Sequence, residues 1–349
     1  MEQRVEAADG PEERSATLRS TDAPVPTDDP ALASADGGAL PTIPGLATSG
    51  AHDGPVSEPV PIAVEEPAVE ERLDAPLPEV SFPPGPDPAR IIAFANQKGG
   101  VGKTTSTISL AAALAELERR VLVVDFDPQG GCSLALGIEP GTLDLSVYNA
   151  LLDRDCRPED VVQKTSVPGV DLLPSNIDLA AAELMLVNEV AREQTLMRVL
   201  SPLRLKYNFI LIDCPPSLGL LTINALTAAD GVIVPLECEY YALRGMGLLM
   251  DSIERIRDRL NPSLHIDGIV ATMYDGRTLH SREVLARVRE AFGGQVFDTM
   301  IRKTIRFAEA PVAGEPILSY APNSPGAMSY RKLAKEVMER VTSSQPSGR

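Results

Sequence analysis

Lysines, threonines and glycines gather in one short run between an apolar segment and a helix-like segment. In order, the run reads Lys98, Gly99, Gly100, Val101, Gly102, Lys103, Thr104 and Thr105. Glycines let the backbone curl so that several N–H groups point at one anion, and the following helix adds its partial positive charge. Lys103 offers a full charge for terminal phosphates, and Thr104 offers a hydroxyl for Mg²⁺. This spacing predicts a phosphate-binding loop.

A second lysine, Lys98, stands at the head of this loop. Within one subunit Lys103 already serves the terminal phosphates, so Lys98 has no task in a simple phosphate-binding loop. Its presence is therefore the most informative departure in the chain.

Carboxylates follow two other apolar runs. Asp125 and Asp127 end the run that begins at Val121, and Asp213 ends the run Tyr207 to Ile212. At the carboxyl ends of parallel strands such side chains sit at the ligand edge of the sheet. Asp213 fits the strand-end aspartate that holds Mg²⁺, commonly through a water, and Asp127 is the candidate for positioning an attacking water. Alternatively, Asp125 and Asp127 only cap the next helix or shape a turn.

The order of apolar runs indicates how these residues are positioned. A strand over Ile91–Ala95, a helix-like run over Ser106–Leu117 and a strand over Val121–Asp125 form a βαβ unit, which requires a parallel sheet. The helix is apolar on most faces, so we expect it to be sandwiched against the sheet. The fold class predicted is α/β: a single P-loop NTPase domain with a mostly parallel twisted sheet flanked by helices. Further strands are expected over 170–175, 207–213, 231–236 and 266–273, and helices over 179–205, 243–260, 281–292 and 327–341.

Charge is distributed unevenly along the 349 residues, whose formal net charge is −17. Residues 1–89 hold 18 acidic and four basic side chains and 16 of the 31 prolines. A segment of this composition cannot bury enough apolar surface to offset its ordering entropy. We therefore expect a disordered acidic tail over 1–88, an ATPase domain over 89–342 and a flexible tail over 343–349. The acidic tail is either a plain solvated segment or a docking or autoinhibitory arm.

Several classes of protein are disfavoured by composition. No run reaches the ~18 apolar residues of a membrane span, and the N-terminus lacks the apolar stretch of a secretory signal. The four cysteines contain no CxxC pair, which is typical of reduced thiols in a cytosolic protein. With only three histidines, a histidine-based catalytic or metal site is not expected.

Three motifs on successive strands together carry a family resemblance. The segments 96–105 and 125–130 and the strand-end Asp213 with the residues up to Ser217 closely resemble the ParA/Soj family of chromosome and plasmid partitioning ATPases. Away from these strands, Glu309-Ala310-Pro311 also resembles that family. That family has a deviant phosphate-binding loop and belongs with MinD-like proteins. The resemblance runs from about Ile91 to Val341.

The resemblance implies roles for individual residues. Lys103 contacts the β- and γ-phosphates of ATP, Thr104 binds Mg²⁺ and Thr105 helps to hold the phosphates. Asp127 positions the water and Asp213 supports Mg²⁺. Lys98 would reach across an ATP-sandwich homodimer to the partner's nucleotide, and a ParB-like protein would stimulate the slow hydrolysis. The expected location is the cytoplasm, in association with the nucleoid.

Double-stranded DNA is the second partner implied. Arg277 and Arg306 match positions where the family carries DNA-contacting arginines, and Arg302, Lys303 and Arg306 form an expected basic loop. Such residues neutralise phosphates without reading bases. We expect no aromatic residues to interleave with these charges, which argues against stacking on single strands.

Three alternatives stay open at this point. A MinD-like membrane-cycling ATPase would need a basic amphipathic helix at the C-terminus, whereas residues 342–349 are polar. An iron–sulfur carrier of the same superfamily would use Cys132 and Cys214, whose spacing does not recommend them. A non-enzymatic scaffold would work through the acidic tail.

Overall fold

Seven strands form one sheet in the computed structural model, which describes residues 87–239 and 242–344. All described residues fall in one of the two compact units into which the chain divides, Val69–Arg349. The predicted tails, 1–88 and 343–349, lie almost wholly outside the described residues. The strands are β1 Arg90–Phe94, β2 Val121–Asp125, β3 Gln163–Lys164, β4 Val170–Leu173, β5 Phe209–Asp213, β6 Gly231–Glu237 and β7 His265–Thr272.

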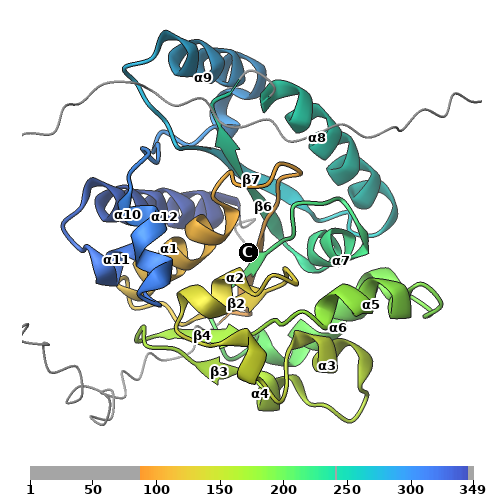
Figure 1. The fold of residues 1–349 in the computed structure, drawn as a ribbon. Coiled ribbons are helices and arrows are strands. Elements are labelled where there is room, and N and C mark those ends of the chain that lie inside the picture. The colour runs from red at the N-terminus through yellow and green to blue at the C-terminus, as the bar shows by residue number, and fades with distance from the viewer. Residues whose placement is uncertain (1–86, 240–241, 345–349) are drawn as a thin grey trace, which may run out of the picture. The chain divides into compact units, whose positions relative to one another are not determined.

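The sheet has the order β3-β4-β2-β5-β1-β6-β7, and only β3 runs antiparallel to its neighbour (Figure 1). The central strands are buried along their length, because helices cover both faces. The register places Asp213 beside Phe94 on one side and beside Asp125 on the other. The ends of β1, β2 and β5 therefore meet at one edge of the sheet, which confirms the predicted α/β fold class.

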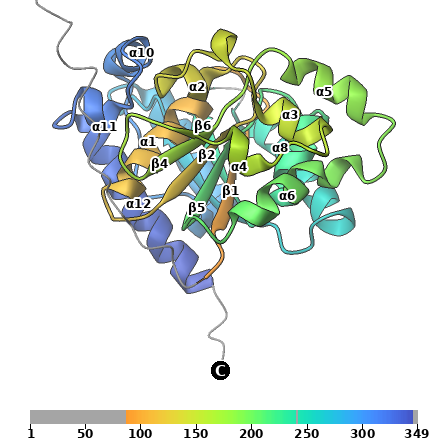
Figure 2. The same cartoon turned by 90° about the horizontal axis from the view of Figure 1, so that it is seen from below.

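Helices form a layer on each face of the sheet, and alternate strand residues pack against each layer. Figure 2 shows α1 and α12 on one side of the strands and α3, α6 and α8 on the other. The helices of eight or more residues are α1 Lys103–Ala115, α5 Leu179–Leu186, α7 Leu220–Ala228, α8 Ala242–Arg259, α9 Leu279–Phe292 and α12 Pro325–Ser344. The shorter ones are α2 Gly131–Ala135, α3 Val147–Leu152, α4 Pro158–Val161, α6 Thr195–Leu200, α10 Arg306–Val312 and α11 Ile317–Tyr320.

Helix α1 lies between the sheet and α12. All but two of its residues are buried, including the whole of the mostly apolar run Ile108–Ala115, as expected for a helix sandwiched against the sheet. The buried hydroxyl of Ser106 hydrogen-bonds the Tyr330 hydroxyl of α12 at 3.0 Å. This packing fixes the direction in which the amino end of α1 faces the loop before it.

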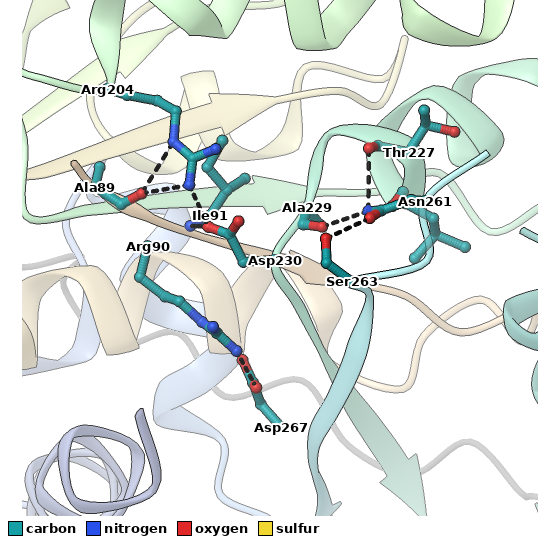
Figure 3. A network of polar contacts seen from close by, with 11 residues as sticks. Ala89, Arg90, Ile91, Arg204, Thr227, Ala229, Asp230, Asn261, Ser263 and Asp267 are labelled. Atoms are coloured by element: carbon teal, nitrogen blue, oxygen red, sulfur yellow. Dashed lines mark hydrogen bonds and ion pairs between the residues drawn. The ribbon is translucent and has the colours of Figure 1, made fainter. Parts of the chain in front are cut away.

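A polar network holds the opposite edge of the sheet, where β1, β6 and β7 begin (Figure 3). The Arg204 guanidinium donates to the Ala89 carbonyl at 3.1 Å and to Asp230 at 2.7 Å. Asp230 in turn accepts the backbone N–H of Ile91 at 2.8 Å, and Arg90 pairs with Asp267 at 2.7 Å. The network anchors the first residues of β1 and so fixes the strand that leads into the glycine-rich loop.

Asn261 caps the end of α7 beside this network (Figure 3). Its buried amide donates to the carbonyls of Leu226, Thr227 and Ala229 at 2.7–3.1 Å. These carbonyls belong to the last turn of the helix and the residue after it, where intrahelical partners run out. A single side chain from the loop after α8 thus satisfies the carboxyl end of α7.

Candidate active site

The loop from Lys98 to Gly102 joins β1 to α1, and its glycines adopt a backbone that other residues avoid. Gly100 and Gly102 have φ of 75° and 83°, in the left-handed region. The Thr272 hydroxyl of β7 donates to the Val101 carbonyl at 2.7 Å and braces the loop from one side. Helix α1 starts directly afterwards at Lys103, so its first N–H groups face the cradle of the loop.

Lys103 is 7% exposed, and its ammonium group lies 3.2 Å from the Lys98 carbonyl. Burial lowers the pKa of Lys103, and the negative charge of Asp213 partly offsets this effect. Among the described residues Lys103 forms no ion pair within 4.0 Å. A buried ammonium group with so little compensation fits a site that takes phosphate oxygens.

Thr104 and Asp213 meet at the edge where β5 ends. The Thr104 hydroxyl donates to Oδ2 of Asp213 at 2.6 Å, and the Cys132 thiol lies 3.4 Å from the same oxygen. Burial, and then the charge of Asp125, raises the pKa of Asp213 to about 7. The second oxygen, Oδ1 of Asp213, is buried without a hydrogen-bond partner.

The oxygen atoms of these groups are suitable ligands for a magnesium ion. The orphaned Oδ1 of Asp213 and the Thr104 hydroxyl are hard oxygen donors of the kind that Mg²⁺ binds. Asp125, Cys132 and Asp213 also each offer an atom within 4.8 Å of the others. The thiol is a soft ligand and is protonated, because burial and then Asp213 raise the pKa of Cys132 well above its usual value. The oxygens, not the sulfur, therefore suit the ion.

Asp125 and Asp127 turn out to have different surroundings. Asp125 is fully buried, and its Oδ2 accepts both the backbone N–H and the hydroxyl of Ser133 at 2.8 Å. Asp125 therefore anchors the first turn of α2, as the helix-capping alternative for this residue supposes. Asp127 is half-buried and its carboxylate accepts the Gln129 N–H at 3.0 Å. Asp127 is also close enough to Lys103 for its negative charge to raise the pKa of that lysine, against the larger effect of burial.

Lys98 points to a pair of carboxylates that the sequence did not single out. Its ammonium group lies 2.8 Å from Glu237 and 2.5 Å from Glu239, at the end of β6 and just beyond it. Thr105 follows Thr104 in the first turn of α1, and no hydrogen bond of its side chain is recorded among the described residues. The structure thus places Lys103, Thr104, Asp127 and Asp213 around one cradle, with Lys98 at its rim.

The predicted DNA-contacting residues lie beyond β7. An isolated parallel bridge joins Tyr274 to Arg302, so the loops carrying Arg277 and Arg302 run side by side. Arg277 is 91% exposed and pairs with Asp275 at 2.7 Å through two nitrogens. The side chains of Arg302, Lys303 and Arg306 are exposed as well.

The expectation of one basic loop is wrong for Arg306. Arg306 is the first residue of α10, a helix that continues through Glu309 and Pro311 to Val312. Arg302 and Lys303 do lie in the loop before it. Arg306 therefore projects from the amino end of a helix, which itself favours anionic groups.

Several contacts at this site were missed by sequence reasoning. Ser133 and Cys132 were not connected to the carboxylates, and Glu237 and Glu239 were not connected to Lys98. No local pattern indicates the first pair, because Ser133 is the third residue of α2 and reaches Asp125 only through the turn between β2 and α2. The contact between Lys98 and Glu237 could be predicted only with knowledge of the strand order, which places β6 beside β1.

Comparison with known proteins assigns the family. A family model described as an AAA domain matches residues 89–266. The sporulation initiation inhibitor protein Soj of Bacillus subtilis is 47% identical over 248 residues, which are 71% of this chain and 98% of that protein. The chromosome partitioning protein ParA of Caulobacter vibrioides is 46% identical over 256 residues, 73% of this chain and 96% of that protein. The chain belongs to the ParA/Soj family of P-loop ATPases. The predicted family is thereby confirmed.

A further relative, an uncharacterized protein of Mycobacterium tuberculosis, is 57% identical over 253 residues, 72% of this chain and 80% of that protein. Among solved structures, a cobyrinic acid a,c-diamide synthase from Mycobacterium smegmatis holds ADP and magnesium. It is 42% identical with a TM-score of 0.65, and the match covers 74% of this chain and 97% of that chain. The cell division ATPase MinD of Pyrococcus furiosus is 29% identical with a TM-score of 0.59 over 72% of this chain and 99% of that one.

Two of these structures bear on the cofactors. Crystals of the Mycobacterium smegmatis protein contain ADP or an ATP analogue, each with magnesium. They bear out the expected cofactors of the ParA/Soj fold, ATP and Mg²⁺. Within residues 87–239 and 242–344, no helix has the length and apolar character to cross a membrane.

Proposed function

We propose that this protein is an ATPase that segregates DNA. In this account ATP drives two subunits together, the dimer binds double-stranded DNA without reading its sequence, and a ParB-like partner triggers hydrolysis and release. One observation carries the proposal: a complete phosphate and magnesium cradle has a second lysine, Lys98, whose side chain lies at its rim. A passive nucleotide binder would not need that second lysine.

The cradle supplies what phosphoryl transfer to water requires. Glycine N–H groups, the start of α1 and Lys103 receive the phosphates, and Thr105 helps to hold them. Thr104 and Asp213 would hold Mg²⁺, which neutralises charge that develops on the phosphates. Lys98 would complete the nucleotide site of the second subunit, so that each site contains groups from both.

Asp127 is proposed to orient the attacking water. Its half-buried carboxylate accepts the Gln129 N–H, which leaves acceptor capacity for a water. In-line attack on the γ-phosphate depends on positioning and charge neutralisation more than on covalent chemistry. Asp125, in contrast, is engaged by Ser133 and serves the structure of α2.

DNA would bind at the exposed arginines beyond β7. Arg277, Arg302, Lys303 and Arg306 come from neighbouring segments at one end of the sheet, and each can neutralise a phosphate. Asp275 is ion-paired with Arg277, so DNA phosphate must compete with this carboxylate. Nucleoid association in the cytoplasm follows from such binding.

The predicted domain division remains part of this proposal: an acidic tail over 1–88, the ATPase domain over 89–342 and a short tail over 343–349. The N-terminal tail, with its net charge of −14, is a candidate docking arm for a partner protein. Buried Cys132 and Cys214 are poorly placed to bridge two subunits through an iron–sulfur cluster.

The name of the Mycobacterium smegmatis structure suggests a second function, ATP-dependent amidation of an acid. A binding assay separates the two. We expect tight binding to duplex DNA of unrelated sequence with ATP, and weak binding with ADP or without nucleotide. Binding that is equal in all three states, or absent with ATP, would contradict the segregation proposal.

A charge reversal tests the DNA-binding surface in the same assay. Arg306→Glu should abolish ATP-dependent DNA binding and leave ATP binding intact, because a phosphate contact becomes a repulsion. Arg259→Glu is the matched control: Arg259 is an exposed arginine at the far end of α8, near the edge where β7 begins. Equal loss of DNA affinity in both variants across a salt titration would refute the assignment of Arg306.

A further inference from the structure

The side chain of Lys98 is held by two carboxylates of its own subunit. Its ammonium group donates to Glu237 at 2.8 Å and to Glu239 at 2.5 Å. Lys98 and Glu239 are about half exposed, whereas the Glu237 side chain is only 19% exposed. The backbone of Lys98 faces the other way, with its carbonyl accepting a hydrogen bond from Lys103.

The backbone around this contact is well anchored. Asn96 is buried, and its amide donates to the Pro235 carbonyl of β6 at 2.7 Å. The side-chain oxygen of Asn96, Oδ1, accepts the Lys98 N–H at 2.9 Å. One side chain thus ties the head of the glycine-rich loop to the strand that ends in Glu237. The Glu239 N–H then bonds the Glu237 carbonyl at 2.8 Å, so the two carboxylates stay close together.

Two negative charges face one positive charge in this cluster. Burial alone would lower the pKa of Lys98, but the hydrogen bonds and charges of Glu237 and Glu239 outweigh it and raise the pKa. The hydrogen bond from Lys98 likewise lowers the pKa of Glu239. The lysine is therefore fully charged and its charge is already compensated within the subunit.

We propose that Glu237 and Glu239 are positioning residues that hold Lys98 on its own subunit and thereby oppose its transfer to the nucleotide of a second copy. This inference rests on the proposed ATP-dependent dimer. Before Lys98 can contact the partner's phosphates, it must leave both carboxylates. A two-fold symmetric dimer requires this step in both subunits, so the free-energy cost of breaking the Lys98 ion pairs applies twice.

The carboxylate pair also increases the preference of subunit association for ATP over ADP. Lys98 must exchange two carboxylate oxygens for phosphate oxygens, and only a nucleotide with enough negative charge near the rim favours this exchange. ATP carries the additional γ-phosphate, which ADP lacks. Without the carboxylates, less phosphate charge would suffice, and ADP would support association more readily.

The first test measures the ion pairs in the absence of nucleotide. The full chain and a Glu237→Gln/Glu239→Gln variant are labelled with an amine-acetylating reagent, and the rate at Lys98 is read by mass spectrometry. Loss of both charges should raise the labelling rate at Lys98 about three- to tenfold, because more of the amine is neutral and free. Lys206, which pairs with Glu159, is the internal reference and should not change. Equal rates at Lys98 in both proteins would overturn the proposal.

The second test measures association by sedimentation with ATPγS and with ADP. The double variant should dimerise about tenfold more tightly than the parent at low salt, and the ATPγS-to-ADP ratio should fall. A Glu116→Gln/Glu159→Gln protein removes the same number of charges at other ion pairs and should behave as the parent does. Introducing Lys98→Ala should cancel the gain.

The outcomes of the second test distinguish a failure of the role of the carboxylates from a failure of the proposed ATP-dependent dimer. Unchanged or weaker association of the double variant, in a parent that does dimerise, overturns the role of the carboxylates. A gain that persists with Lys98→Ala also overturns it, since the carboxylates then act through another group. If no protein dimerises with ATPγS, the proposed function fails as well, and the labelling result still reports whether the ion pairs exist.

Discussion

At the residue scale, two aspartates that are only two positions apart differ in burial and in hydrogen bonding. Asp125 is buried, anchors Ser133 and has its pKa raised to about 6 by burial. Asp127 is half-buried, and beyond the Gln129 N–H its carboxylate keeps acceptor capacity. The same residue type therefore serves the structure at one position and is available for chemistry at the other.

This division predicts the behaviour of an Asp127→Ala protein. ATP binding should persist, whereas steady-state hydrolysis should fall by about 10²-fold or more, because the water loses the group that orients it. The variant should accumulate as an ATP-bound dimer on DNA. Phosphate release measures the rate and sedimentation measures the dimer. Undiminished hydrolysis would show that Asp127 does not position the water.

At the element scale, the carboxyl end of α7 depends on one side chain from another loop. Asn261→Ala should leave the carbonyls of Leu226, Thr227 and Ala229 buried without donors. We expect a loss of about 2–3 kcal/mol in the free energy of unfolding, measured by urea denaturation. Ser263→Ala removes only the hydrogen bond to Asn261 Oδ1 and should cost about 1 kcal/mol or less. Equal losses in the two variants would contradict the capping role.

The strands that carry chemistry could be located from the sequence, because each is a short apolar run that ends in a carboxylate or a glycine turn. The run Val121–Asp125 is a strand with the predicted bounds, and the predicted helix over 243–260 is α8 to within a residue at each end. Helix α7 was not predicted, since its residues are buried on nearly every side and show no amphipathic period.

Other features depend on tertiary structure that no local pattern reveals. Strand β3 is two residues long and exists only through its pairing with β4. Helix α10 begins at Arg306, which was expected in a loop with Arg302 and Lys303, and it includes Pro311, a residue that is unfavourable inside a helix. The partners of Lys98 lie 139 and 141 positions away and become neighbours only because β6 pairs with β1.

At the scale of the whole molecule, the two lysines of the loop have separate surroundings. Lys103 is buried beside the magnesium ligands, whereas Lys98 is at the rim and is neutralised by the end of β6. A subunit with Lys98 in this position would hold a nucleotide with its own groups alone. In the proposed function, ATP joins two subunits only when both lysines cross over, and hydrolysis limits how long they stay joined.

The most direct measurement of this account is the mass of the protein in solution with ATPγS, determined by sedimentation for the parent and for Lys98→Ala. The account predicts a dimer of the parent with ATPγS, a monomer with ADP, and a monomer of Lys98→Ala with either nucleotide, although that variant still binds ATPγS. A Lys98→Ala protein that dimerises with ATPγS as the parent does, and hydrolyses ATP at the parent's rate, would contradict it.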